Sequence, residues 1–383
     1  MAYPPHPRVR TIAIGLVAAL LPLAGRADVS PDVARVMAQL RVEESPRSLR
    51  EMGHWQAPRK ILLLAQNNPA LRQQAAAFAA IAPAARVVVA TDRAMALREG
   101  TDADVIIGAN PEVCDANLLQ DAHALRWLAS LSAGIELCAP LPPVHRPDLV
   151  MTNMRGADAP AIAEHAIALM LALAHGLDVF AADTAHATWS RQNASTTSMQ
   201  MLDGKTLLVV GLGSIGTEVA LRAHALGMKV VATRDGGSGT PAFVEHVGPP
   251  SELIALARTA DVVLSAVPLT PQTTGLYDAA FFAALKPTAF FINVARGGSV
   301  VTAELVRALN EHRLAGAGLD VVDPEPLPPE HPLWRAPHVL VTPHISSRSD
   351  LPGESRWILA RENLRRYVAG EKLLLVVDPN RGY

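Results

Sequence analysis

The stretch "LLVVGLGSIGTEVALRAHALGM", residues 207–228, decides the fold of this chain. A short apolar run stops at Gly211, and a helical pattern follows it almost directly. With Gly213 and Gly216, this residue gives the G-x-G-x-x-G spacing of a phosphate-binding turn between a strand and a helix. The glycines permit a tight turn, close approach of a pyrophosphate, and close packing of the helix on the strand. The motif predicts a dinucleotide-binding domain.

Short apolar runs alternate with helical segments on both sides of this loop, a pattern typical of parallel sheets with both faces covered. Further strands are predicted within residues 60–66, 85–90, 102–109, 125–138, 149–153, 229–233, 261–268, 289–295, 316–322 and 338–344. Helices are predicted within residues 70–82, 159–189, 251–259, 303–313 and 353–370.

The order of these segments predicts the domain organisation. We expect an α/β protein with two doubly wound parallel-sheet domains, in which a Rossmann cofactor domain is inserted into a flavodoxin-like substrate domain. The cofactor domain would cover residues 157–345, and the substrate domain residues 59–156 and 346–383. Residues 28–58 would form an irregular, partly helical lead-in. The apolar tail at 372–378 should pack back on the first domain.

Composition excludes several classes of protein. Half of the 383 residues are hydrophobic and the net charge is −2, with no basic block of the kind that nucleic-acid binding requires. Cys114 and Cys138 are too few for a disulfide scaffold, so we expect two unpaired, mostly buried thiols. His165 and His175 are expected to be packing or surface residues. No cluster has the spacing of a metal site, and no metal is predicted.

The N-terminus has a pattern of its own. Two arginines precede an apolar run at residues 11–23, and small residues follow up to Ala27. This is the order of a secretory signal, and the run is short for a membrane span. We expect residues 1–27 to be a signal peptide, and the mature protein to be periplasmic or secreted without stable membrane insertion. An uncleaved anchor or a start codon placed too early are the alternatives. If the signal is not used, the protein would be cytoplasmic.

Three segments beyond the glycine loop contain residues suited to catalysis. They are "NVARGGSVV" with Arg296, "GLDVVDPEPLP" with Asp320 and Glu325, and "VTPHIS" with His344. Together with "SAGIELC", "AEHAIALMLAL", "GLGSIG", "VPLTPQTTGL" and "ENLRRYVAGE", they make the chain resemble the D-isomer-specific 2-hydroxyacid dehydrogenase family from about residue 60 to the C-terminus. The order and spacing of the blocks match the family. After His344, "ISSRSDLPGES" is polar where many members have small apolar residues, which leaves the substrate size open.

The resemblance implies that Arg296 holds the substrate, that His344 is the acid and base, and that Glu325 is the partner of His344. These residue types suit a 2-oxo acid, which has a carboxylate beside its carbonyl. A guanidinium can bind the carboxylate through two parallel hydrogen bonds. Reduction places negative charge on the carbonyl oxygen, and histidine can supply a proton near neutral pH. A neighbouring carboxylate would orient the imidazole and favour its protonated form.

The resemblance also assigns binding residues. Cofactor contacts are expected from Gly211, Gly213, Ser214, Ile215, Gly216, Thr233, Arg234, Pro268, Thr273, Ala295 and Asp320. In the family, the residue matching Asp320 meets the nicotinamide carboxamide. Substrate contacts are expected from Arg296, from Asn153, and from the loop with Ala133 and Gly134. A plain turn at a strand end is the alternative for that loop. A homodimer through the cofactor domain is also expected.

The choice between NAD and NADP depends on "KVVATRDGGSG", residues 229–239. Arg234 stands 23 residues after Gly211, where an acidic residue would bind the ribose 2′-OH of NAD. Arginine can instead pair with the 2′-phosphate of NADP, with Thr233 adding a hydroxyl. The alternative is that Arg234 faces solvent and Asp235 serves NAD. We expect NADP(H) to be preferred and NAD(H) accepted, because a charge-assisted contact adds only about 1.5–3 kcal/mol.

The leading hypothesis is an oxidoreductase that transfers a hydride reversibly between NAD(P)H and a small 2-oxo acid, giving a D-2-hydroxy acid. Glyoxylate, hydroxypyruvate and phenylpyruvate-like acids are candidate substrates. Formate or phosphite oxidation on the same scaffold is one alternative, although the long N-terminal extension typical of formate dehydrogenases is not evident. A non-catalytic nucleotide-sensing interaction protein, like the corepressor relatives of the family, is another. An export signal would argue against a transcriptional role.

Overall fold

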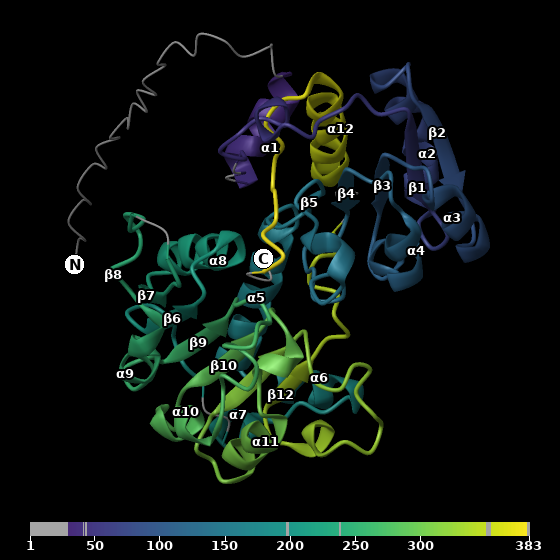
Figure 1. The fold of residues 1–383 in the computed structure, drawn as a ribbon. Helices are drawn as coiled ribbons and strands as arrows, with labels where there is room; N and C mark the ends of the chain where they lie inside the picture. The colour runs from purple at the N-terminus through teal and green to yellow at the C-terminus, as the bar shows by residue number, and fades with distance from the viewer. Residues whose placement is uncertain are drawn as a thin grey trace, which may run out of the picture.

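The computed structural model describes residues 30–40, 42, 44–196, 199–236, 239–349 and 354–380. These residues form two α/β bodies joined side by side (Figure 1). The expected signal peptide lies outside the described residues. Both bodies are built on parallel sheets, as the alternation of apolar runs and helical segments predicted.

The first body contains a five-stranded parallel sheet in the order β2-β1-β3-β4-β5, the flavodoxin-like arrangement. Its strands are β1 (Lys60–Leu64), β2 (Arg86–Ala90), β3 (Val105–Gly108), β4 (Trp127–Ser130) and β5 (Val150–Thr152). Helix α2 (Pro69–Ile81) covers one face, and α3 (Arg93–Gly100) and α4 (Ala116–Asp121) cover the other. The central strands are apolar at nearly every position because both faces are covered.

The second body contains a seven-stranded parallel sheet in the order β12-β11-β10-β9-β6-β7-β8. Its strands are β6 (Thr206–Val210), β7 (Lys229–Thr233), β8 (His246–Gly248), β9 (Val262–Ser265), β10 (Phe290–Asn293), β11 (Gly316–Leu319) and β12 (Val339–Val341). One face packs on α5 (Ala159–Ala174) and α8 (Ser214–Ala225), and the other on α9 (Leu253–Ala257), α10 (Ala279–Ala284) and α11 (Thr302–Asn310). The order of β6 to β11 is that of the Rossmann fold.

The helical stretch expected at 159–189 is not continuous. Helix α5 stops at Ala174, and α6 (Leu177–Ala185) leaves at an angle of 77°. Gly176 lies between them with φ of 63°, a left-handed conformation that glycine adopts without steric cost. A third helix, α7 (Arg191–Thr196), follows. In the described part of the chain no single helix is long and apolar enough to cross a membrane, although α5 and α6 meet that test as a bent pair.

After β12 the chain returns to the first body. Helix α12 (Glu354–Ala369) stands beside α1 (Pro31–Leu40) of the lead-in and packs on α2 (Figure 1). The apolar tail packs back on the first sheet, as predicted, through a bridge between Val376 and Thr152. The second body is therefore an insertion between two parts of the first. The residue at which each domain ends stays a prediction.

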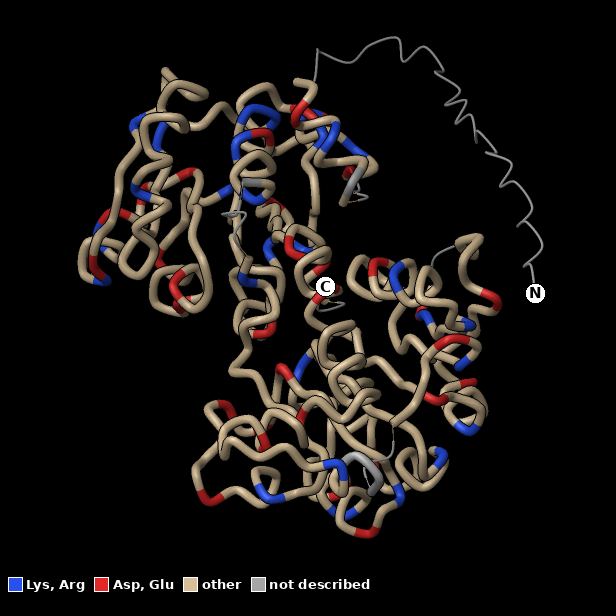
Figure 2. Tube along the Cα trace, turned by 180° about the vertical axis from the view of Figure 1, so that it is seen from behind, with Lys and Arg blue, Asp and Glu red and all other residues tan. Residues whose placement is uncertain are grey.

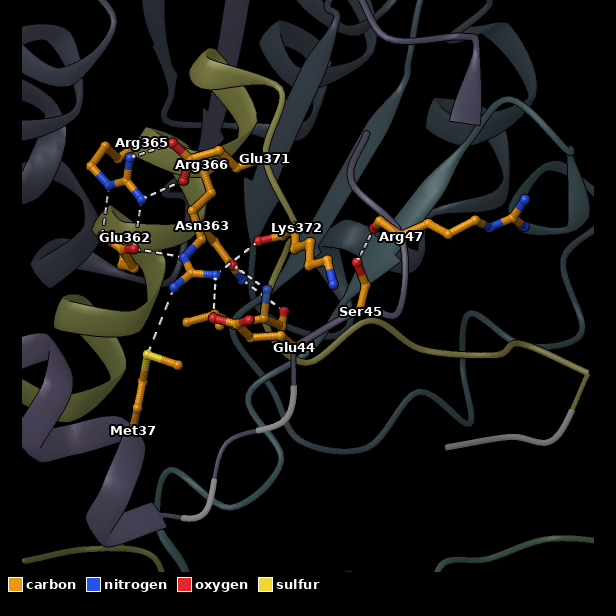
Figure 3. Close-up of polar contacts among 11 residues, drawn as sticks. Met37, Glu44, Ser45, Arg47, Glu362, Asn363, Arg365, Arg366, Glu371 and Lys372 are labelled. Atoms are coloured by element: carbon orange, nitrogen blue, oxygen red, sulfur yellow. Dashed lines mark hydrogen bonds and ion pairs between the residues drawn. The ribbon is translucent and has the colours of Figure 1, made fainter. Parts of the chain in front are cut away.

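A buried network of charges joins the lead-in, α12 and the tail. Figure 3 shows Arg366 between Glu362 and Glu44. Nε of Arg366 donates to Oε1 of Glu362 at 2.6 Å, and Nη1 donates to Oε1 of Glu44 at 2.9 Å. Burial acts to raise the pKa of Glu362, but Arg365 and Arg366 outweigh it and hold that pKa below its usual range. On the same helix, Asn363 pairs with the backbone N–H and C=O of Leu374 in the tail. The network thereby fixes the tail against the first domain.

The expectation of two unpaired thiols was wrong. Cys114 and Cys138 form a disulfide, with 4.7 Å between their Cα atoms. The reason is the parallel pairing of β3 with β4, which sets Gly108 beside Ser130 at the ends of the two strands. The loops that follow these strands carry the two cysteines. A separation of 24 residues gives no local signal of this contact.

Charges of both signs are spread over the two bodies. Lys and Arg alternate with Asp and Glu along the trace in Figure 2, and no extended basic stretch dominates that view. This distribution fits the low net charge of the sequence. It offers no support for nucleic-acid binding, which requires a concentrated basic face.

Candidate active site

The carboxyl ends of the parallel strands place the predicted cofactor residues along one edge of the second sheet. In the glycine loop, Gly211 has φ of 97°, and a Cβ there would lie 2.7 Å from the carbonyl oxygen of Ala266. A Cβ on Gly216 would overlap the carbonyl oxygen of Gly211. A Cβ on Gly213 would meet nothing within 4 Å, so open space lies above the turn. The first residue of α8 is Ser214, and its N-cap has no side-chain hydrogen bond.

This geometry fits a dinucleotide. A helix N-terminus without a side-chain cap, with Ser214 and Ile215 in its first turn, presents N–H donors to a phosphate. The open space above Gly213 would admit it.

The other predicted cofactor residues follow neighbouring strands. Arg234 comes directly after β7 and donates from Nη2 to the carbonyl oxygen of Gly239. Thr233 is buried, whereas Asp235 is exposed. After β9, the hydroxyl of Thr273 donates to the carbonyl oxygen of Pro268 at 2.6 Å. Ala295 is buried after β10, where its carbonyl oxygen accepts from Arg296 Nη1.

His344 and Glu325 form a hydrogen-bonded pair. Nδ1 of His344 lies 2.9 Å from Oε2 of Glu325, and the other oxygen of Glu325 accepts from the backbone N–H of Val322. A carboxylate only accepts, so Nδ1 carries the hydrogen and Nε2 is left for a reacting group. His344 has φ of 52°, which a residue other than glycine rarely adopts. Such strain persists where the surroundings enforce it.

Asp320 supplies that constraint. Its backbone carbonyl accepts from the N–H of His344, and its carboxylate accepts from Thr342 Oγ1 at 2.6 Å and from the N–H groups of Ile345 and Ser346. Burial acts to raise the pKa of Asp320, but hydrogen bonds from Ser346, Thr342 and Ile345 prevail and lower it. The residue therefore holds the loop that carries His344.

His165 belongs to this network, which corrects the expectation of a packing or surface residue. Its Nε2 lies 2.9 Å from Oγ1 of Thr342 and 3.7 Å from Oδ1 of Asp320. Helix α5 crosses behind the strand ends and brings His165 to a residue 177 positions later. Only the fold shows this contact, because nothing near His165 in the sequence indicates it.

Arg296 follows β10 and faces the first domain. Its Nε donates to Oε1 of Glu136 at 2.8 Å, and Nη1 donates to the carbonyl oxygen of Ala295 at 2.7 Å. The side chains of Arg296 and Glu136 are 32% and 28% exposed. This pair bridges the two carboxyl edges, so the predicted catalytic residues of the second domain face the predicted substrate loop of the first. Sequence reasoning missed Glu136.

The predicted substrate loop runs from Ser132 to Gly134 after β4. Asn153 Nδ2 donates to the carbonyl oxygen of Ala133 at 2.7 Å, and Asn110 Nδ2 donates to that of Gly134 at 2.9 Å. The side chain of Asn153 is buried. It therefore positions the loop from behind, while Ala133 is exposed on the open side. The disulfide lies at the base of the same loop.

Within the residues that the structure describes, no group of three or more His, Cys, Asp or Glu side chains could hold a metal ion. The expected absence of a metal stays a prediction. The chemistry available at the site is that of one guanidinium, one imidazole–carboxylate pair and a nucleotide-binding edge.

Comparisons with known proteins agree with this arrangement. The model of the D-isomer specific 2-hydroxyacid dehydrogenase NAD-binding domain matches residues 167–346. A glyoxylate reductase/hydroxypyruvate reductase of Mus musculus is 31% identical over 275 residues, which are 70% of this chain and 84% of the mouse protein.

Solved structures of related proteins have a similar fold, and two of them serve as examples. A D-isomer specific 2-hydroxyacid dehydrogenase family protein of Aeromonas salmonicida has a TM-score of 0.71 and 29% identity, and the match covers 84% of this chain and 99% of that one. An NADPH-dependent glyoxylate/hydroxypyruvate reductase of Sinorhizobium meliloti, solved with NADP and sulfate, has a TM-score of 0.70 and 26% identity. That match covers 85% of this chain and all of the other.

Proposed function

Because the chain belongs to the D-isomer-specific 2-hydroxyacid dehydrogenase family, we propose that it reduces a small 2-oxo acid to a D-2-hydroxy acid with NAD(P)H, and that the reaction is reversible. One observation carries this proposal. Arg296, Glu325 and His344 follow three adjacent strands, and Arg296 reaches the loop of the first domain that is suited to a carboxylate. Glyoxylate and hydroxypyruvate are the substrates to try first.

In this reaction Arg296, His344 and Glu325 would have different roles. The bound nicotinamide would supply the hydride to the carbonyl carbon. Arg296 would bind the carboxylate and polarise the carbonyl oxygen. Nε2 of His344 would donate a proton to that oxygen as negative charge develops on it, and would remove the proton in the reverse direction. Glu325 fixes the imidazole through Nδ1, so that Nε2 points to the reacting group.

A panel of 2-oxo acids tests the reaction. At least one small 2-oxo acid should cause oxidation of NADPH and NADH, which is measured as a loss of absorbance of the reduced nicotinamide. His344→Ala should bind cofactor but lose turnover by about 10²–10⁴-fold, because it lacks the proton donor. Cofactor binding without turnover on the whole panel would favour the nucleotide-sensing alternative. Turnover with formate or phosphite alone would favour that chemistry instead.

We also propose that NADP(H) is the preferred cofactor and that NAD(H) is accepted. Support comes from Arg234 at the end of β7 and from the relative solved with NADP. Since Thr233 is buried, Arg234 is the residue better placed to meet a 2′-phosphate. Arg234→Ala should lower kcat/KM for NADPH about tenfold or more and leave that for NADH nearly unchanged. If Asp235 serves NAD, Asp235→Asn should weaken NADH alone, and wild type should prefer NADH.

We further propose that residues 1–27 are removed and that the enzyme works in the periplasm or outside the cell. The disulfide supports an oxidising compartment, because glutathione and thioredoxin keep cytosolic thiols reduced. Cofactor supply is the difficulty, since nicotinamide nucleotides are not normally recycled outside the cytoplasm. A cofactor that stays tightly bound and is reduced in place would remove the need for a supply of free nucleotide. N-terminal sequencing of the native protein decides the matter, because an intact Met1 in the cytoplasmic fraction contradicts export.

A further inference from the structure

The ion pair between Arg296 and Glu136 places a negative charge inside the carboxylate-binding part of the candidate site. Arg296 Nε and Glu136 Oε1 are 2.8 Å apart. A Cβ atom on Gly134 would overlap both Nη2 of Arg296 and Oε2 of Glu136. The two charged groups therefore stand over the glycine of the loop that would receive the substrate.

The donors of Arg296 are already partly used. Nε is taken by Glu136 and Nη1 by the carbonyl oxygen of Ala295, and Nη2 makes no hydrogen bond to any described residue. A carboxylate that binds through two parallel bonds needs two neighbouring donors of the guanidinium. A carboxylate that binds side-on, through Nε and Nη2, must therefore displace Glu136, whereas one that binds end-on uses the remaining N–H groups of Nη1 and Nη2 beside it. Glu136 is the charged competitor.

The loop holds Glu136 in place. Two residues before it, the carbonyl oxygen of Gly134 accepts from Asn110, and two residues after it, Cys138 is buried and joined to Cys114. Ile135 between them is buried as well. The carboxylate is therefore presented to the site from a segment anchored on both sides.

The charges of the site balance in pairs. Arg296 and Glu136 sum to zero, and protonated His344 and Glu325 also sum to zero. A substrate with one carboxylate can be held by exchanging with Glu136 at the guanidinium. A second anionic group on the substrate would be repelled by the displaced carboxylate of Glu136. None of these four residues supplies a further positive charge to bind that second group.

We propose that Glu136 is a specificity-determining residue that selects against 2-oxo acids with a second negative charge, such as phosphorylated or dicarboxylic acids. It acts through Arg296, by competing for the guanidinium and by repelling the extra anion. The substrate class named here rests on the proposed function. The charge selection itself can be measured by binding, without turnover.

The experiment compares oxamate, a monoanion, with oxalate, a dianion of similar shape. Binding of each to the NADPH-loaded enzyme is measured by calorimetry in wild type and in Glu136→Gln. Oxalate affinity should rise about tenfold in the variant, because the repulsion between Glu136 and the second carboxylate is removed. The gain is limited to this size because about a third of each side chain of the ion pair is exposed to screening solvent. Oxamate affinity should rise by less than about threefold, because only the competition for Arg296 is relieved and oxamate carries no second charge to be repelled.

Two further variants control for structure. Glu136→Asp keeps the charge and should keep the discrimination, even if the shorter side chain alters affinity overall. Glu164→Gln makes the same chemical change at a glutamate on α5 whose side chain is 73% exposed, and the oxalate-to-oxamate ratio should not move. In turnover, Glu136→Gln should raise kcat/KM for oxaloacetate relative to pyruvate, mainly through KM.

The outcomes separate this inference from the proposed function. A shift in the oxalate-to-oxamate ratio without turnover of any 2-oxo acid would keep the charge selection and reject the reaction. Turnover with an unchanged ratio would reject the charge selection alone. If neither anion binds either protein, the assignment of this pocket to carboxylates is wrong, and the inference is overturned with it.

Discussion

Gly213 differs from the other two glycines of its loop in what surrounds it. Gly211 needs a positive φ, and Gly216 has backbone where a Cβ would stand. Both are therefore required by the fold of the loop itself. Gly213 has φ of −89° and open space in front of it. Nothing in the protein alone requires glycine there, so we propose that the requirement comes from a bound pyrophosphate.

Gly213→Ala should therefore separate binding from folding. We expect the variant without cofactor to unfold close to the wild-type temperature, since a change at an N-cap from glycine to alanine costs at most about 1 kcal/mol. Its affinity for NADPH should fall tenfold or more, because the added methyl group occupies the path of the pyrophosphate. Thermal unfolding and fluorescence titration would measure the two effects. A normal affinity in a folded variant would refute the phosphate assignment.

The sequence indicates the candidate catalytic residues more readily than the residues that contact them. Arg296, Glu325 and His344 stand in distinctive local motifs, and the structure brings Glu325 and His344 together at 2.9 Å. Glu136 contacts a residue 160 positions later, and His165 one 177 positions later. The first contact depends on how the two sheets face each other, and the second on how α5 packs on the second sheet. No local pattern encodes either arrangement.

At the scale of the elements, the disulfide between Cys114 and Cys138 should contribute measurably to the free energy of unfolding. It closes a loop of 24 residues around β4 and the substrate loop. In the chain-entropy account, such a cross-link stabilises a fold by about 3 kcal/mol, by restricting the unfolded chain. Cys114→Ala with Cys138→Ala should lower the free energy of urea unfolding by about that amount. Wild type with reductant should behave like the double variant.

The control for this prediction is the response to reductant. The double variant should unfold at the same urea concentration with and without dithiothreitol, whereas wild type should shift. Thiol titration of the unfolded wild-type protein should find no free thiol before reduction. Two free thiols in the native protein would contradict the disulfide.

Elements buried on both sides were the easiest to predict. β1, β3 and β4 are apolar at nearly every position because helices cover both faces of the sheet. β8 was missed, since it has three residues at the sheet edge and its first residue, His246, is exposed. The break between α5 and α6 was missed because one glycine is tolerated in a helical pattern.

At the scale of the whole molecule, an apolar surface on the cofactor domain supports assembly, and we propose a homodimer through it. Leu177, Met199 and Met201 are more than half exposed and Trp189 is 92% exposed. The segment folds back on itself, because the N–H of Gln200 donates to the carbonyl oxygen of Ala174. Large apolar side chains as exposed as these are typical of interaction surfaces when they lie together. A second copy of the chain would cover it.

Trp189→Glu should convert the dimer to monomer, because it would bury an unpaired charge in an apolar interface. Sedimentation equilibrium should give twice the chain mass for wild type and one chain mass for the variant. Trp334→Glu is the matched control, since that tryptophan is 50% exposed and lies outside this segment. A wild-type monomer, or a variant that stays dimeric, would contradict the assignment of this surface.

The insertion of one body into the other has a consequence for a chain that has been cut. The peptide passes between the bodies twice, once near α5 and once between β12 and α12. A protease that cleaves one of these passages leaves the other as a covalent tether. Each cleaved molecule would then run as two fragments on a denaturing gel, yet elute as one species in native chromatography. Only a second cut, in the other passage, would leave the halves to part by dilution.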